Sequence, residues 1–145
     1  MTGSCLSFDI VPSNVAHPVG VEVWVNHHCI VDVDRLDQQL RVEQQFNDEI
    51  EQQHTVKIIL KNKTQEHTQI NQNLEIVSDS VIEIKNLALD DLDISSIISQ
   101  LAVYYHSFNS QSTALPHRFY NTMGCNGVVE FSISTPAYLW LLEHQ

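Results

Sequence analysis

Short runs in which apolar residues alternate with polar ones recur along most of this chain. In residues 5–11, for example, Leu6, Phe8 and Ile10 are separated by polar side chains, which is the period of a strand with one buried face. The same period returns in residues 20–34, 39–46, 55–61, 81–85 and 129–133. A strand with one apolar face must bury it against another layer, so six or seven such strands predict an antiparallel, jelly-roll-like β-sandwich.

Residues 20–34 predict a hairpin within this sandwich. The first strand places three valines on one face and Glu22 and Trp24 on the other, and residues 26–28 supply the turn. A second turn is predicted at Asn126-Gly127, directly before the last alternating run. Both hairpins connect strands that are close in sequence, which favours antiparallel pairing.

Two segments have a different pattern and predict helices. One amphipathic helix packed on the sandwich is predicted by the spacing of Ile94, Ile97, Ile98, Leu101, Tyr105 and Phe108. A polar loop is expected to follow at residues 109–119. At the C-terminus, Thr135 as N-cap and Pro136 as first helical residue predict a short terminal helix, although the same residues could prolong the last strand.

Length and hydropathy bound the architecture further. The 145 residues correspond to one β-sandwich domain spanning residues 1–145. No run of about 18 apolar residues predicts a membrane span, and residues 1–5 lack the features of a secretory signal. We therefore expect no membrane partner and a location in a host cytoplasm or in a virion.

Charge narrows the class of partner. Eighteen acidic residues against seven basic ones give a net charge of −11, so we expect no nucleic acid to bind. Residues 38–54 are rich in Gln and poor in Lys, which suits packing of neighbouring copies without strong repulsion. The three cysteines have no disulfide or metal spacing and are expected to be small core thiols.

No known catalytic pattern occurs in the sequence. It contains no GxSxG, no glycine-rich phosphate loop and no HExxH. Adjacent His27 and His28 would point to opposite faces of a strand, which makes them a poor chelating pair. We therefore predict that the protein is not an enzyme.

Two acidic groups are candidates for binding a hard cation such as calcium. They are Asp32, Asp34 and Asp37, and Asp90, Asp91 and Asp93. The first group lacks the Gly and the downstream Glu of an EF-hand, and polar-out alternation favours the solvated face of a strand. The second group directly precedes the predicted helix, where carboxylates also cap backbone N–H groups.

Aromatic residues are candidates for ligand binding. Trp24 lies on the polar side of its strand, where an exposed indole would stack on a sugar ring and a covered one would belong to the core. Tyr104 and Tyr120 are expected to extend such a platform. Trp24, Tyr104 and Tyr120 are thus the predicted ligand-binding residues.

Several segments resemble calcium-dependent, xylan-binding carbohydrate-binding modules. The resemblance rests on VEVWVNHHCIVDVD, on HTVKIILKN at residues 54–62 and on residues 73–94. It implies a sandwich that binds a glycan with the help of calcium. The implied metal ligands are Asn62, Asp79, Asp90 and Asp91, although Lys63 follows Asn62 where those modules have Asp.

Residues 54–94 and 117–143 also resemble uncharacterised small proteins of tailed cyanobacterial phages. This resemblance implies a non-catalytic β-sandwich associated with the virion, with a role in attachment or assembly. Its partners would be other virion proteins or a glycan. The alternatives are a free calcium-dependent carbohydrate-binding module and a modulator of a host protein.

Oligomeric state is left open by the sequence. Residues 137–142 form a strongly apolar cluster near the C-terminus. Such a cluster either packs on its own sandwich or docks into a partner, which includes a second copy.

Overall fold

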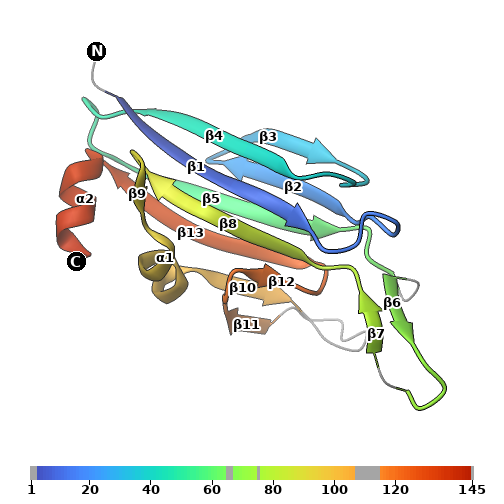
Figure 1. Cartoon of the computed structure of the whole chain (residues 1–145). Helices are drawn as coiled ribbons and strands as arrows, with labels where there is room; N and C mark the ends of the chain where they lie inside the picture. The colour runs from blue at the N-terminus through green and yellow to red at the C-terminus, as the bar shows by residue number, and fades with distance from the viewer. Residues whose placement is uncertain (1–2, 65–66, 75, 107–114, 145) are drawn as a thin grey trace.

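The computed structural model describes residues 3–64, 67–74, 76–106 and 115–144, and these form an antiparallel β-sandwich (Figure 1). The fold class predicted from the alternating runs is therefore confirmed. A five-stranded sheet has the order β12 (Thr122–Met123), β8 (Ile82–Leu89), β1 (Gly3–Pro12) and β4 (Leu40–Asn47), with β9 (Leu92–Asp93) paired to β8. A six-stranded sheet has the order β11 (Leu115–Arg118), β10 (Val103–His106), β13 (Gly127–Thr135), β5 (Gln52–Lys61), β2 (Gly20–Val25) and β3 (His28–Val33).

A third, two-stranded sheet was not predicted from the sequence. It pairs β6 (Thr68–Ile70) with β7 (Ile76–Asp79), and it projects from one end of the sandwich (Figure 1). This segment is polar and lacks the alternation that marks the other strands, so it gave no strand signal.

Alternating side chains from both sheets meet in one hydrophobic core. The central strands supply residues that are at most 3% exposed: Leu6, Phe8, Ile10, Val56, Ile58, Leu60, Val129, Phe131 and Ile133. Complete burial of one such side chain stabilises the fold by about 1.5–3 kcal/mol. The core therefore fixes which face of each strand points outward.

The polar side of β1 is buried as well, which the sequence did not predict. Ser7 and Asp9 are 5% and 6% exposed. A bulge in β8 places Asn86 at a positive φ of 57°, and its amide donates a 2.7 Å hydrogen bond to Asp9 Oδ2. This bond, together with one from Arg41, lowers the pKa of Asp9, so its carboxylate stays charged under this cover.

The predicted helix is shorter than expected and was wrong beyond Leu101. Helix α1 comprises Ser95–Leu101, and Ala102 then adopts an extended conformation with ψ 143°. Residues 103–106 continue as β10 and pair with β13. Phe108 lies outside the described residues, as do residues 109–114 of the predicted loop. The loop prediction is wrong over residues 115–118, which form β11.

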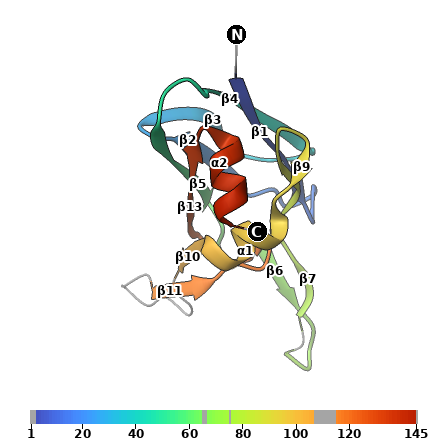
Figure 2. The same cartoon turned by 90° about the vertical axis from the view of Figure 1, so that its left-hand side faces the viewer.

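The terminal helix is confirmed, although its cap differs from the prediction. Helix α2 (Ala137–Glu143) lies across the end of the sandwich (Figure 2) and buries Ala137 and Trp140. Pro136, not Thr135, occupies the N-cap position, and the Ala137 N–H bonds to Asp48 Oδ1 instead. The apolar cluster thus packs partly on its own sandwich. Within the described residues, neither helix has the length and apolar character to cross a bilayer.

His54 on β5 joins three segments near this end of the core. The Asn26 amide can only donate to His54 Nδ1, at 3.2 Å, so the ring proton is on Nε2 and bonds to Thr135 Oγ1 at 3.2 Å. Thr135 in turn donates to the Ile50 carbonyl at 2.7 Å. Burial lowers the pKa of His54, which keeps the imidazole neutral in the folded protein.

We expect His54 to make the fold sensitive to mild acid. The unfolded chain binds a proton below the ordinary pKa of about 6.5, whereas the folded imidazole stays neutral to lower pH, so stability falls as the pH drops below that value. The contribution of one such group reaches up to about 1.4 kcal/mol per pH unit.

Urea unfolding of the wild type and of His54→Gln between pH 7.5 and 5 measures this effect. The loss of stability on acidification should be smaller in His54→Gln, which retains hydrogen-bonding groups but cannot titrate. Equal slopes for the two proteins would show that His54 does not carry the pH dependence.

Candidate binding face

The outward side of the six-stranded sheet is a surface that the core leaves open. We call this surface the outer face, and every one of its residues is half-buried or exposed. It comprises Glu22, Trp24, Thr55, Lys57, Ile59, Lys61, Val103, Tyr105, Val128, Glu130, Ser132 and Ser134. Because these residues alternate with core residues on four neighbouring strands, their side chains share one side of the sheet.

Strand register places these residues in rows across the sheet. Trp24 pairs with Lys57, Lys57 with Glu130, and Glu130 with Val103. Three strand spacings of about 4.8 Å give this row a length of roughly 14 Å. A second row runs from Glu22 through Ile59 and Val128 to Tyr105.

Trp24 lies in a hollow near one end of the first row. The hollow has a volume of about 290 Å³ and is lined by Trp24, Asn26, His27, Lys57 and Ile59. The indole is half-buried, and its Nε1–H donates a 2.9 Å hydrogen bond to Glu22 Oε1. Trp24 is therefore a surface residue fixed in orientation, with one part of its ring accessible.

A larger groove, of about 530 Å³, lies near the other end of the row, beside the two helices. Tyr105, which is 38% exposed, lies in the groove with Leu101 of α1 and Trp140 of α2. Polar groups complete the lining: Gln53, Glu130, Ser132, Ser134, Glu143 and His144. The groove combines aromatic surface with hydroxyl, amide and carboxylate groups.

The other two predicted ligand residues do not lie with Trp24. Tyr104 is 5% exposed on the inner side of β10, and its hydroxyl donates to the Cys125 carbonyl and accepts from the Cys125 N–H at 2.9 Å. Burial raises the pKa of Tyr104 to about 12, so it stays neutral. Tyr120 is 69% exposed beyond β11, with the Arg118 guanidinium 5.3 Å from its ring. Tyr105, which was not predicted as a ligand-binding residue, lies on the same face as Trp24, where Tyr104 and Tyr120 were expected.

Lys61 forms ion pairs with three carboxylates near the edge of the outer face, and two of them, Asp32 and Asp34, belong to the first predicted cation-binding group. Its ammonium lies 2.5 Å from Asp32, 3.2 Å from Glu22 and 3.4 Å from Asp34. Hydrogen bonds to these carboxylates, that to Asp32 above all, raise the pKa of Lys61. The oxygens proposed for a cation therefore already surround an internal cation.

The four predicted metal ligands are not brought together. Asp79 precedes β8 and Asp90 and Asp91 follow it, so the eight-residue strand separates them by roughly 25 Å. Asp90 accepts the Cys5 N–H at 2.7 Å, and Asn62 donates to the Asp34 carbonyl. Within the described ranges, no cluster of three or more His, Cys, Asp or Glu residues is arranged to hold a metal ion.

Asp90, Asp91 and Asp93 have local structural roles in the fold. Asp90 and Asp91 both have positive φ, at 52° and 67°, and form the two-residue turn between β8 and β9. Asp93 Oδ1 accepts hydrogen bonds from the Ser95 hydroxyl at 2.6 Å and from the Ser95 N–H at 2.8 Å at the start of α1, and these two bonds lower the pKa of Asp93. The capping interpretation is therefore wrong for Asp90 and Asp91, and Ile94 occupies the N-cap position, although Asp93 does bond to the first N–H of α1.

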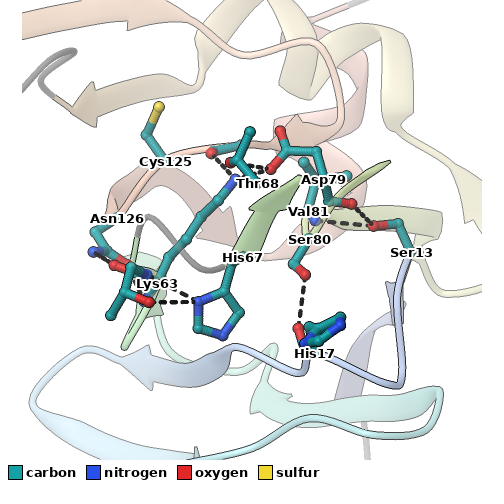
Figure 3. A network of polar contacts seen from close by, with 12 residues as sticks. Ser13, His17, Lys63, His67, Thr68, Asp79, Ser80, Val81, Cys125 and Asn126 are labelled. Carbon is teal, nitrogen blue, oxygen red and sulfur yellow. Dashed lines mark hydrogen bonds and ion pairs between the residues drawn. The ribbon is translucent and has the colours of Figure 1, made fainter. Parts of the chain in front are cut away.

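A polar network that sequence reasoning missed is centred on Lys63 (Figure 3). The Lys63 side chain is only 9% exposed, and its ammonium lies 2.8 Å from Asp79 Oδ1 and 2.5 Å from the Gly124 carbonyl. Burial alone would raise the pKa of Asp79, but hydrogen bonds from Lys63 and Thr68 outweigh it and lower the pKa. Asn126 exchanges two further bonds with the Lys63 backbone.

Two serines extend this network to the β1–β2 loop (Figure 3). Ser13 Oγ donates to the Asp79 carbonyl at 2.9 Å, and Ser80 Oγ donates to the His17 carbonyl at 2.7 Å. The network thus ties the β6–β7 hairpin to the sandwich. Its members come from distant parts of the chain, so no local motif could have revealed it.

The cysteines are not core residues, which corrects the expectation from the sequence. Cys29 is exposed on β3, and Cys5 and Cys125 are half-buried. Burial raises the pKa of the Cys125 thiol, which lies next to the Lys63 network, so this thiol is protonated at neutral pH. The Lys63 network therefore has a structural role, and it does not activate the Cys125 thiol as a nucleophile.

Comparisons with protein-family models, with curated proteins and with solved structures found no match for this chain. The geometry of the outer face and its hollows consequently carries the functional argument.

Replacing Lys61 by Met should unmask the acidic group. Glu22, Asp32 and Asp34 would lose their common partner, and we expect the free energy of unfolding to fall. Calcium should then raise the unfolding midpoint of Lys61→Met more than that of the wild type. Thermal unfolding with calcium or with chelator measures both, and identical calcium shifts would refute the role assigned to Lys61.

Proposed function

We propose that this protein is a non-catalytic β-sandwich that binds a partner through its outer face, as an attachment or assembly component of a phage particle. One observation carries the proposal: a regular row of half-exposed residues crosses four strands and links the Trp24 hollow with the Tyr105 groove. Central strands whose outward side stays open offer a flat, rigid surface, which suits binding of an extended partner.

The chemistry of the outer face favours a polar partner without high charge. Its hydroxyl groups come from Thr55, Ser132 and Ser134, and its aromatic groups from Trp24 and Tyr105. Lys61 is held by acidic neighbours within the chain and is therefore not available to bind an anion. The net charge of −11 opposes a polyanion at longer range.

The resemblance to small phage proteins supports a place for this surface in a virion. Mass spectrometry of purified particles of the encoding phage should detect the chain in a fixed copy number. Trp24→Ala and Tyr105→Ala should reduce its incorporation at least tenfold, whereas Tyr138→Ala, which removes an exposed aromatic on α2, should not. Absence of the wild-type chain from particles would contradict the proposal.

Glycan binding is the second candidate, and the Trp24 hollow specifically favours it. A half-buried indole anchored through Nε1 presents an aromatic surface on which a sugar ring can stack. The neighbouring Asn26 and Lys57 could donate hydrogen bonds to sugar hydroxyls.

A glycan array probed with the purified chain tests this candidate. We expect retention on neutral polysaccharides, with at least a tenfold loss of affinity in Trp24→Ala and no change in Tyr138→Ala. Parallel arrays with calcium and with chelator reveal any metal requirement. A blank array under both conditions would eliminate glycan binding and leave the assembly role to the particle experiment.

A further inference from the structure

Strand β4 is an unprotected edge of the five-stranded sheet. It pairs with β1 over eight residues without a register shift, and in the part of the chain that the structure describes no strand pairs with its other side (Figure 1). The other edges of the two large sheets are protected, because β3 contains a bulge at Ile30, β11 contains Pro116, and β12 and β9 have two residues each. A regular edge of this length is a template for another strand.

Hydrogen bonds at one end of β1 show which backbone groups of that strand face which neighbour. The Cys5 N–H donates to Asp90 Oδ1 at 2.7 Å, and the Cys5 carbonyl accepts from the Asp90 N–H at 2.8 Å. The N–H and C=O groups of odd-numbered residues in β1 therefore point toward β8, and those of even-numbered residues point toward β4, because backbone groups alternate in direction along a strand.

The register transfers this alternation to β4. Phe8 is opposite Val42, so the even-numbered residues of β4 bond to β1. The N–H and C=O groups of Arg41, Glu43 and Gln45 consequently point toward the free side. Among the described residues, Arg41 and Glu43 thus present backbone groups to an incoming strand, whereas the Gln45 carbonyl already accepts a 2.9 Å hydrogen bond from Gln44 Nε2.

We propose that a second copy of this chain pairs with β4, antiparallel, about a two-fold axis that passes through Val42. The two five-stranded sheets then form one continuous sheet. A two-fold axis normal to the sheet keeps corresponding faces together, so residues on the outward side of one copy meet residues on the outward side of the other.

Charge complementarity selects this register. With Val42 opposite its own copy, Arg41 of each chain lies opposite Glu43 of the other, which makes two opposite-charge pairs. Moving the axis by one residue sets Arg41 against Arg41 or Glu43 against Glu43, and like charges directly opposite are destabilising. Both side chains are exposed, Arg41 by 48% and Glu43 by 59%. Within one chain Arg41 lies 3.2 Å from Asp9 and 3.5 Å from Glu43, so the pairs across the axis would form by exchange of the intrachain Arg41–Glu43 contact.

The composition of β4 and its surroundings also suits a second copy. Gln44 and Gln45 are uncharged, so two strongly acidic chains can approach here without adjacent carboxylates meeting. A groove of about 380 Å³ runs between β4 and the β3 edge, lined by Gln44, Phe46 and Ile30 among others, so solvent reaches this side. Pairing of two short edges buries little area, which predicts a weak, concentration-dependent dimer.

Disulfide trapping tests both the contact and its register. In a Cys29→Ser background, which removes the exposed thiol, Val42→Cys places two sulfurs beside the axis on the core side of the joined sheet, where Val42 is 3% exposed in one chain. The two residues form a non-hydrogen-bonded pair with Cα atoms about 4.5 Å apart, within disulfide range. We expect Val42→Cys to form a covalent dimer on mild oxidation, at least tenfold faster than Gln44→Cys and than the background alone.

Sedimentation equilibrium of the full chain tests the dimer without a cross-link. The wild type should associate as concentration rises. Glu43→Arg, which opposes Arg41, and Glu43→Pro, which removes an N–H that points toward the second copy, should each weaken association at least tenfold. Glu83→Arg, a matched charge reversal on exposed β8, should leave it unchanged. Circular dichroism confirms that each variant is folded.

Two results would overturn the inference: a monomeric wild type at every concentration, or a dimer that Glu43→Arg and Glu43→Pro leave intact. Preferential trapping of Gln44→Cys would overturn the register. The outcome is independent of the outer face, which belongs to the other sheet, so Trp24→Ala should dimerise like the wild type.

Discussion

The pairing of β5 with β13 in the middle of the six-stranded sheet is the constraint on which the other features depend. The two strands pair over nine residues, from Gly127 opposite Leu60 to Thr135 opposite Gln52. One side of this pair carries Ile58, Phe131 and the rest of the core, and the other side carries the middle of the outer face. Since side chains alternate strictly along a strand, a slip of one residue would exchange the two sides. Burial of the core therefore also determines which polar residues meet a partner.

Both proposed interactions use surfaces that are not buried or paired when the core forms. A sandwich buries one side of each sheet, so the outward side of central strands and the backbone groups of edge strands remain available. The outer face uses side chains, which can distinguish partners by shape and hydrogen bonding, whereas β4 uses backbone groups with charged neighbours that set the register. The Lys63 network and α2 complete the ends of the sandwich and hold these surfaces in place.

The sequence predicted the elements whose signals are local. Alternation at Leu6, Phe8 and Ile10 identified β1, and the turn at Asn26 identified the β2–β3 hairpin. The helix prediction failed after Leu101 because Tyr105 happened to continue the helical spacing, while pairing of β10 with distant β13 imposed a strand. The site depended on such distant pairings throughout. Trp24 was chosen correctly as an outward residue, but only the fold shows that Tyr105 shares its face, that Tyr104 is buried and that Lys61 occupies the acidic cluster.

The accessibility of Trp24 most directly tests the claim that the outer face is open. Trp140→Phe leaves Trp24 as the sole tryptophan, so its fluorescence reports this surface alone. Acrylamide quenching of this variant in the native state is the decisive measurement. An open outer face predicts substantial quenching, intermediate between that of the native-state interior and that of the unfolded chain. A blue-shifted emission that acrylamide leaves unquenched would show that the outer face is covered and is not a binding surface.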